Sequence, residues 1–174
     1  MTDSRLAALA DRIEIQDVLA RYVRGVDRAD EALLKSCYHT DAIEEHGSVY
    51  QGLAHRYFEA AIPRLQTSGP MAHYITSSHI DFIDADKAYV ETYVLTFFRV
   101  RKNDKDYDTL TGGRYCDSFE RRDGVWRIAY RKLSFDWNRD MEPNEGWCVG
   151  HFDWSHPAMH RGTKDKTDLS YSRF

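Results

Sequence analysis

The chain has 174 residues, which is the size of one domain and long enough to bury a substantial core. Its 42% hydrophobic and 30% charged residues are ordinary for a globular protein and exclude a largely disordered chain. The formal net charge of −4, with both signs interspersed, argues against a nucleic-acid partner, which requires a basic face. No apolar stretch approaches the roughly 20 residues that span a bilayer, so no membrane partner is expected.

The cysteines and the N-terminus bear on the compartment. Cys37, Cys116 and Cys148 are an odd number of thiols without metal-ligand spacing, which favours free thiols in a reducing environment. The N-terminal residues lack the apolar core of a signal peptide. These features together predict a cytoplasmic protein.

The first part of the chain, up to Pro70, carries two kinds of hydrophobic pattern. Apolar residues recur at helical spacing in three segments, and shorter strand-like segments lie between the second and third of these. Asp30 precedes the second helical segment and is a typical N-cap residue, whereas Gly25 is expected to weaken the last turn of the first. The patterns predict, in chain order, helices over 6–28 and 31–38, strands around 42–45 and 49–51, and a helix over 53–65.

From His73 onwards the chain is rich in alternating apolar and polar residues, the pattern of half-buried strands. Asp123 and Gly124 separate two such runs, and Asp-Gly between strands predicts a tight hairpin turn. The predicted strands cover 73–83, 88–102, 107–120 and 125–137. Helices followed by antiparallel strands predict an α+β domain in which a strongly curved sheet wraps the N-terminal helices.

Residues 1–138 contain no repeat or linker and are interpreted as one domain. Residues 139–174 form a C-terminal extension, which we expect to pack on the barrel or on a neighbouring subunit. Its early aromatic residues, with Trp137 before them, are either a lid over a pocket or packing residues that touch no ligand: Trp147, Phe152 and Trp154.

Two residues of this sequence suit acid–base chemistry. Asp27 lies near the end of the first predicted helix, and His73 lies at the start of a predicted strand. A carboxylate that accepts an imidazole N–H fixes the tautomer and favours the imidazolium formed after proton abstraction. Such a pair contributes on the order of 10²–10⁴ in rate. Taken singly, Asp27 is also a common turn residue at a helix end, and His73 an ordinary strand residue.

In their order along the chain, the helix ending in Asp27, the strand with His73 and the sequence 112–126 resemble the SnoaL-like branch of the NTF2-like superfamily. The resemblance covers roughly residues 6–138 and is closest to the hexachlorocyclohexane dehydrochlorinase, bile-acid 7α-dehydratase and scytalone dehydratase type of lyase. It implies a cone-shaped α+β barrel, a deep apolar pocket and a homo-oligomer, either trimer or dimer. The sequence departs from this family at Ser77–His79, where an asparagine is common.

The resemblance also implies roles for particular residues. His73 corresponds to the base that removes a proton, and Asp27 to the carboxylate that orients it. Tyr22 and Arg131 correspond to groups that donate hydrogen bonds to a departing or negatively charged oxygen. The substrate pocket is expected to be lined by Val23, His46, Phe98, Tyr115, Leu133 and Trp137.

This chemistry requires neither a metal nor a redox cofactor. The extension contains a His pair at i, i+4, a spacing that can bind metal on a helix, but Pro157 lies between His156 and His160. No further ligand has clear spacing around this pair, so no metal site is expected.

The expected activity is that of a cofactor-independent lyase that eliminates water, halide or formaldehyde from a hydrophobic substrate. Relatives that deformylate lignin-derived diarylpropanediols belong to the same resemblance, and the 11 Tyr and 4 Trp favour a bulky aromatic substrate. One alternative is an isomerase or cyclase of the ketosteroid or polyketide type, which returns the proton to another carbon. Another is a non-catalytic ligand-binding protein or a dioxygenase small subunit, which needs no pair of Asp27 and His73.

Overall fold

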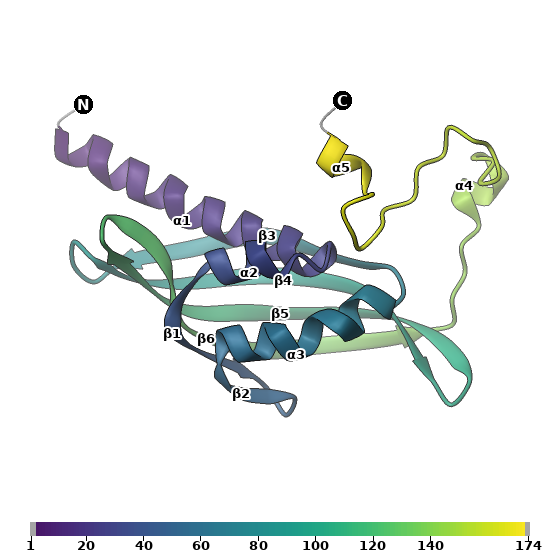
Figure 1. Cartoon of the computed structure of the whole chain (residues 1–174), viewed down its shortest axis with the longest axis horizontal. Coiled ribbons are helices and arrows are strands. Elements are labelled where there is room, and N and C mark those ends of the chain that lie inside the picture. Colours follow the sequence, from purple (N-terminus) through teal and green to yellow (C-terminus); the bar gives the residue numbers. More distant parts are fainter. Residues whose placement is uncertain (1–2, 173–174) are drawn as a thin grey trace.

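The computed structural model describes residues 3–172. Its elements are, in chain order, α1 (Asp3–Asp27), α2 (Glu31–Ser36), β1 (Tyr38–His46), β2 (Tyr50–Leu53), α3 (Ala54–Thr67), β3 (Met71–Phe82), β4 (Lys87–Lys102), β5 (Lys105–Arg122), β6 (Val125–Met141), α4 (Trp147–Gly150) and α5 (Leu169–Ser172). Helices α1, α2 and α3 lie on one face of the sheet, and the segment after β6 extends beyond it (Figure 1).

The six strands form one sheet in the order β2-β1-β6-β5-β4-β3. Strands β1 and β6 pair in parallel, and every other neighbouring pair is antiparallel. Strands β2 and β3 are the two edges, so the curved sheet is open and does not close into a barrel. The predicted α+β class, with a mostly antiparallel sheet around the N-terminal helices, is confirmed.

The helical segment before β1 differs from the prediction in two details. The second helix ends at Ser36, because Cys37 caps it and Tyr38 already pairs with Ile128 of β6. Helix α1 continues past Gly25 without a break, and a Cβ there would lie 2.9 Å from Leu34. Glycine at this position therefore allows α2 to approach α1 closely.

Two local predictions are confirmed. The side chain of Asp30 accepts a hydrogen bond from the backbone N–H of Leu33, at 3.2 Å, and so caps α2. The turn between β5 and β6 has positive φ at Asp123 (53°) and Gly124 (77°), as a two-residue hairpin with a right-handed strand twist requires. This tight turn sets the register of the two longest strands.

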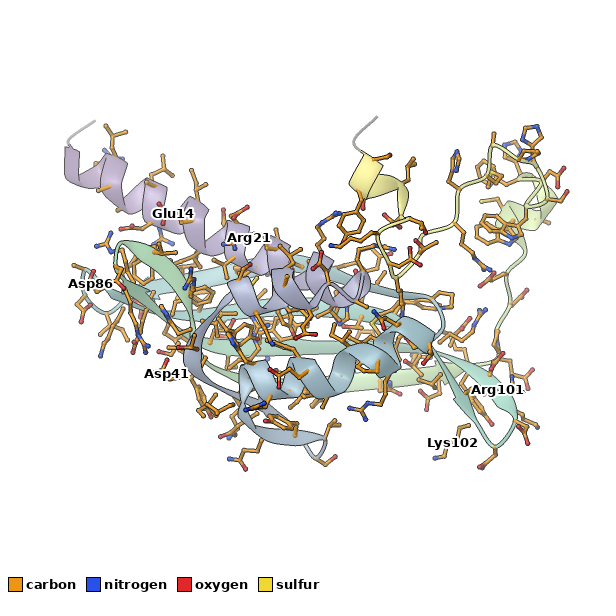
Figure 2. The ribbon with its side chains drawn as sticks, viewed as in Figure 1. Glu14, Arg21, Asp41, Asp86, Arg101 and Lys102 are labelled. Carbon is orange, nitrogen blue, oxygen red and sulfur yellow. The ribbon has the colours of Figure 1, made fainter. Side chains whose placement is uncertain are left out.

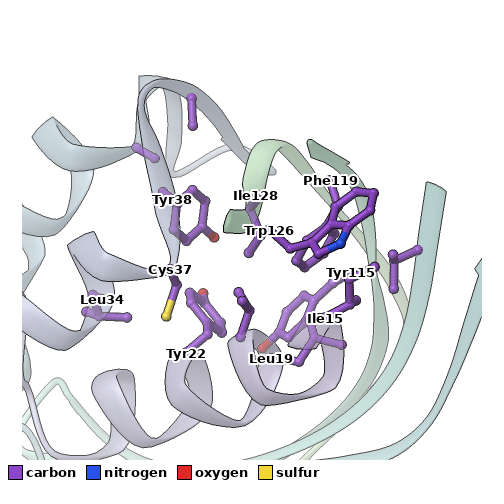
Figure 3. Close-up of a cluster of buried hydrophobic side chains, with 14 of the residues drawn as sticks. Ile15, Leu19, Tyr22, Leu34, Cys37, Tyr38, Tyr115, Phe119, Trp126 and Ile128 are labelled. Atoms are coloured by element: carbon purple, nitrogen blue, oxygen red, sulfur yellow. The ribbon is translucent and has the colours of Figure 1, made fainter. Parts of the chain in front are cut away.

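The core lies between α1 and the concave face of the sheet (Figure 3). Ile15 and Leu19 of α1 pack with side chains of β5 and β6, including Phe119 and Trp126, which are at most 1% exposed. Burial of each such side chain contributes about 1.5–3 kcal/mol to folding before the cost of ordering the chain. This core fixes the face of α1 that also carries Tyr22.

Most charged side chains lie away from this core, with Glu44, Asp117 and Arg131 as buried exceptions. Asp86, Arg101 and Lys102 lie at the turns that join the long strands, and Glu14 lies on the outer part of α1 (Figure 2). Among the residues that the structure describes, no helix combines the length and the apolar character needed to cross a membrane.

The end of the C-terminal segment returns to α1 and α2. Arg28 donates to Asp168 at 3.1 Å, and the hydroxyl of Tyr171 donates to Asp30 at 2.7 Å. Lys166 also forms an ion pair with the Asp30 carboxylate. The last part of the chain thereby holds the turn that directly follows Asp27.

Candidate active site

A cavity of about 640 Å³ lies between the helices and the concave face of the sheet. Its lining is mainly apolar and aromatic, with side chains from α1, α2, α3 and five of the strands, and its volume is within the usual range for small-molecule sites. The polar exceptions include His73, His46 and the hydroxyl-bearing side chains of Tyr22 and Tyr115. An apolar cavity with few polar groups suits a hydrophobic ligand that is oriented at particular atoms.

His73 and Asp27 meet at the edge of this cavity. Asp27 is the last residue of α1. His73 is the third residue of β3, the edge strand that packs beside α1. The Nδ1 atom of His73 is 2.7 Å from Oδ1 of Asp27, and the backbone N–H of His73 donates to Oδ2 at 3.0 Å. Both carboxylate oxygens are therefore bound to one residue, which fixes the direction of the imidazole ring.

The hydrogen bond to Asp27 determines which nitrogen of His73 is available. With Nδ1 donating to the carboxylate, Nε2 is the atom left to accept a proton. The two side chains are 12% and 13% exposed, so the pair is shielded but not sealed, and His73 itself lines the cavity. This is the arrangement in which a carboxylate stabilises an imidazolium formed during proton abstraction.

Tyr22, on the face of α1 that packs in the core, also lines the cavity. The side chain is only 2% exposed, and burial raises the pKa of its hydroxyl well above the ordinary value, so the group stays protonated and can donate a hydrogen bond. The ring of Tyr115 lies edge-on at 5.5 Å, and burial also raises the pKa of that hydroxyl. The cavity thus has two protonated phenols on its wall.

Arg131 lies behind these two rings and does not line the cavity. Its Nε and Nη2 atoms each donate to Asp117 at 2.7 Å, and both side chains are 0% exposed. The guanidinium carbon is 4.1 Å from the ring centroids of both Tyr22 and Tyr115. Arg131 therefore contacts the aromatic wall. Two of its three guanidinium nitrogens donate to Asp117, and among the described residues the buried Nη1 has no hydrogen-bond partner.

The structure brings most of the predicted site residues to one cavity. The predicted residues that line the cavity are Tyr22, His46, His73, Phe98, Tyr115, Leu133 and Trp137. Val23 instead packs against the core, Arg131 lies behind the wall, and Asp27 reaches the cavity through His73. Asp27 also lines a second, more polar pocket of about 530 Å³ beside Arg28 and Lys164.

The aromatic residues of the C-terminal extension lie outside this cavity. Trp147 stacks on Trp154 at 4.2 Å between ring centroids and lines the second pocket, while Phe152 is 47% exposed. Of the four aromatic residues considered for a lid, only Trp137 lines the main cavity. Across residues 3–172, no group of three His, Cys, Asp or Glu side chains is placed as metal ligands.

Sequence reasoning missed two buried acids, Glu44 and Asp117. Asp117 lies between Tyr115 and Phe119 at alternate positions of β5, so its side chain points to the core face. A charged residue in phase with core residues of a strand was the available signal for a buried ion pair. Glu44 is in phase with Ala42 of β1 in the same way and is 0% exposed.

Comparisons with known proteins agree with this architecture. The SnoaL-like domain family matches residues 7–132. A hexachlorocyclohexane dehydrochlorinase from Sphingobium indicum is 31% identical over 129 residues, which cover 72% of this chain and 82% of the relative. The solved structure of LinA-type3, a hexachlorocyclohexane dehydrochlorinase from Novosphingobium barchaimii, has a TM-score of 0.72 at 24% identity, over 79% of this chain and 94% of that chain.

A scytalone dehydratase-like structure from Novosphingobium aromaticivorans has a TM-score of 0.69 at 19% identity and covers 79% of this chain and 92% of that chain. Its identity is low, so it supports the fold alone. The resemblance predicted from the ordered motifs is thereby confirmed. Its extent and the sequence identity to the dehydrochlorinase show that this chain belongs to the SnoaL-like domain family and has an NTF2-like fold.

Proposed function

We propose that this protein is a cofactor-independent lyase that abstracts a proton with His73 and releases a small group from a hydrophobic, aromatic substrate. The observation that carries the proposal is the 2.7 Å hydrogen bond between His73 Nδ1 and Asp27, made by an imidazole that lines an apolar cavity. The names of the related dehydrochlorinases support elimination as the reaction type.

The proposed step begins with the free Nε2 atom of His73. It takes a proton from a C–H or O–H group of the substrate, and the electron pair left behind forms a double bond as the leaving group departs. Asp27 stabilises the imidazolium that results, because its carboxylate accepts the Nδ1 proton. The hydroxyl of Tyr22 donates a hydrogen bond to the departing or negatively charged oxygen.

Arg131 has a positioning role in this proposal. Its guanidinium is bound to Asp117 and packs on the rings of Tyr22 and Tyr115, so it holds the two phenols in place and does not touch the substrate. A cation over an aromatic face contributes about 2 kcal/mol or more when both are desolvated. Two such contacts on one guanidinium give the wall of the cavity a rigid support.

The lining of the cavity supports a proposal for the substrate class. Phe58, Phe98 and Trp137 offer aromatic surfaces, and the volume of about 640 Å³ accommodates more than one ring. A diarylpropanediol of the lignin-derived type combines two such rings with hydroxyl groups that His73 and Tyr22 can reach. We therefore propose this class, ahead of compact halogenated rings, as the substrate.

The proposal is tested by incubating the purified protein with three compounds that give different products. A 1,2-diarylpropane-1,3-diol releases formaldehyde, γ-hexachlorocyclohexane releases chloride, and a β,γ-unsaturated 3-ketosteroid rearranges without release. We expect formaldehyde from the diol, and a loss of about 10²–10⁴-fold in kcat for His73→Ala. His79→Ala, on the same strand but outside the cavity lining, is the matched control and keeps wild-type turnover.

Isomerisation of the ketosteroid without release of a small molecule from the other compounds would replace the lyase with an isomerase. Turnover by His73→Ala at the wild-type rate would remove this residue from the mechanism. Tight binding of all three compounds without any product would indicate a ligand-binding protein.

A further inference from the structure

A second histidine of the cavity wall is also held by a carboxylate. We propose that His46, oriented by Glu44, is an additional acid–base residue that binds a substrate oxygen and protonates it as it leaves. This proposal rests on the proposed lyase function and deepens it, because it assigns the proton that the leaving group needs. It also restricts the substrate to a compound with a second oxygen atom that can face His46 while His73 faces the proton it removes.

The contacts of His46 define the ring orientation. Its Nδ1 atom lies 3.3 Å from Oε1 of Glu44, and its ring packs on Tyr57 at 5.1 Å and on Phe135 at 6.5 Å between centroids. The side chain is 25% exposed and lines the cavity. With Nδ1 bound to Glu44, Nε2 is the nitrogen available to a ligand.

The burial of Glu44 beside His46 is the observation that makes His46 a candidate acid. The Glu44 side chain is 0% exposed, and its other oxygen, Oε2, accepts a hydrogen bond from Tyr38 at 2.9 Å. Burial of a carboxylate is costly unless a partner compensates its charge. Among residues 3–172 no Lys or Arg forms an ion pair with Glu44, because Arg131 on the neighbouring strand is bound to Asp117. The imidazolium of His46 is therefore the cation that Glu44 can stabilise.

The topology places the two histidines on different walls. His46 is the last residue of β1, and His73 lies on β3, the far edge of the sheet. Because the sheet curves around the helices, both side chains line the same cavity. A substrate between them can present one hydroxyl to the base and a second hydroxyl, two carbons away, to the proton donor.

For a 1,2-diarylpropane-1,3-diol the step balances without any further reagent. His73 takes the proton of the terminal hydroxyl, and the C=O bond of formaldehyde forms as the adjacent C–C bond breaks. The released electron pair forms the C=C bond between the two aryl-bearing carbons and expels the benzylic hydroxyl. That oxygen takes a proton from Nε2 of the protonated His46, so the products are formaldehyde, a stilbene and water. Proton exchange with solvent returns both histidines to their starting forms.

A comparison of leaving groups tests this assignment. Hydroxide is a poor leaving group and needs a proton, whereas chloride leaves as a stable anion. For His46→Phe we expect kcat with the diol to fall about 100-fold, and kcat for any chloride release from γ-hexachlorocyclohexane to fall at least tenfold less. A far-UV circular dichroism spectrum that matches wild type shows that the variant is folded. His73→Ala is expected to lose both activities, because the base is needed for each.

Glu44 is a positioning residue in this scheme. Glu44→Gln keeps an oxygen that can accept from Nδ1 but removes the charge that stabilises the imidazolium. We expect kcat with the diol to fall about tenfold with KM nearly unchanged, and little effect on chloride release. Equal losses with both leaving groups in His46→Phe or in Glu44→Gln would overturn the proposal, since a purely structural role does not distinguish them.

A binding measurement decides the same point without turnover. Quenching of tryptophan fluorescence compares 1,2-diphenylethanol with 1,2-diphenylethane, which differ by one benzylic hydroxyl. We expect wild type to bind the alcohol about tenfold more tightly, and His46→Phe to lose this preference while His73→Ala keeps it. If wild type converts neither substrate, the proposed lyase function fails, and the hydroxyl preference alone supports or overturns the role of His46. Absence of the preference in wild type overturns it.

Discussion

Two pairs of a basic side chain with a carboxylate have the same short nitrogen–oxygen distance in this molecule but differ in their exposure to solvent. His73 and Asp27 are 2.7 Å apart at the cavity edge and 12% and 13% exposed. Arg131 and Asp117 are also 2.7 Å apart, yet 0% exposed. In the first pair one nitrogen of the base remains available, whereas in the second two guanidinium nitrogens bind the carboxylate and aromatic rings cover the group.

The difference separates a reactive pair from a structural one. A proton can reach His73 from the cavity, and burial is incomplete, so the pair can change its charge during a reaction. Arg131 keeps its charge, because the attraction of Asp117 outweighs the effect of burial and its pKa is raised above the ordinary value. Short ion-pair distances by themselves therefore do not identify a catalytic group. A catalytic group must also be accessible to the ligand.

The largest effect is expected from breaking the sealed pair. Arg131→Leu leaves the Asp117 carboxylate buried without its partner, and we expect the free energy of unfolding to fall by about 3–5 kcal/mol. Denaturant unfolding followed by circular dichroism measures this loss. The double variant Arg131→Leu with Asp117→Leu removes both charges and is expected to recover most of it. A loss below about 1 kcal/mol in the single variant would show that the pair is not structural.

Tyr22 lies between the two pairs and sharpens the comparison. Its ring packs on Arg131, and the residue also lines the cavity. Tyr22→Phe keeps the ring, so we expect the free energy of unfolding to change by less than about 1 kcal/mol. Loss of the hydrogen-bond donor is expected to lower kcat by about 10²-fold with KM nearly unchanged. Steady-state kinetics with the diol would contradict this role if only KM rose.

The weakest effect is expected from the charges that hold the C-terminal segment against the turn after α1. Burial alone raises the pKa of Asp168, but hydrogen bonds from Ser170 and Thr163 and the charge of Arg28 outweigh it and lower the pKa to about 2. The unfolded value is about 3.9, so this contact stabilises the docked segment above about pH 4. The stabilisation, about 1 kcal/mol after solvent screening, is lost as the pH falls towards 2.

The amides of Thr163 and Ser170, which both donate to Asp168, report this titration by NMR. We expect their chemical shifts to move together with a midpoint near pH 2. A midpoint near pH 4 would mean that the C-terminal segment does not hold Asp168 in solution.

Much of the fold could be predicted from local patterns. Helical spacing located α1, and the Asp123-Gly124 turn located the hairpin between β5 and β6, because both depend on neighbouring residues. The parallel pairing of β1 with β6 joins segments far apart in the chain, and no local pattern encodes it. Asp168 and Arg28 are equally distant in sequence, so the docking of the C-terminal segment on the turn after α1 could not be predicted.

The candidate site divides in the same way. The cavity lining by Tyr22 and Phe98 followed from ordered motifs, because the resemblance carries the three-dimensional arrangement with it. Strand alternation indicates which face a side chain occupies, but not how deeply it lies. Arg131 was therefore expected at the pocket, whereas the structure places it behind the aromatic wall and bound to Asp117. The role of Glu44 depends on burial, which a single acidic residue in a strand does not reveal.

The central claim is that the carboxylate of Asp27 acts through His73 in the chemical step. Asp27→Asn tests it most directly, because the amide nearly keeps the shape but cannot stabilise an imidazolium. With the diol as substrate we predict that kcat falls by about 10²–10⁴-fold, while KM and the free energy of unfolding stay close to wild type. A variant that turns over at the wild-type rate, or one whose loss is matched by unfolding of the protein, would contradict this account.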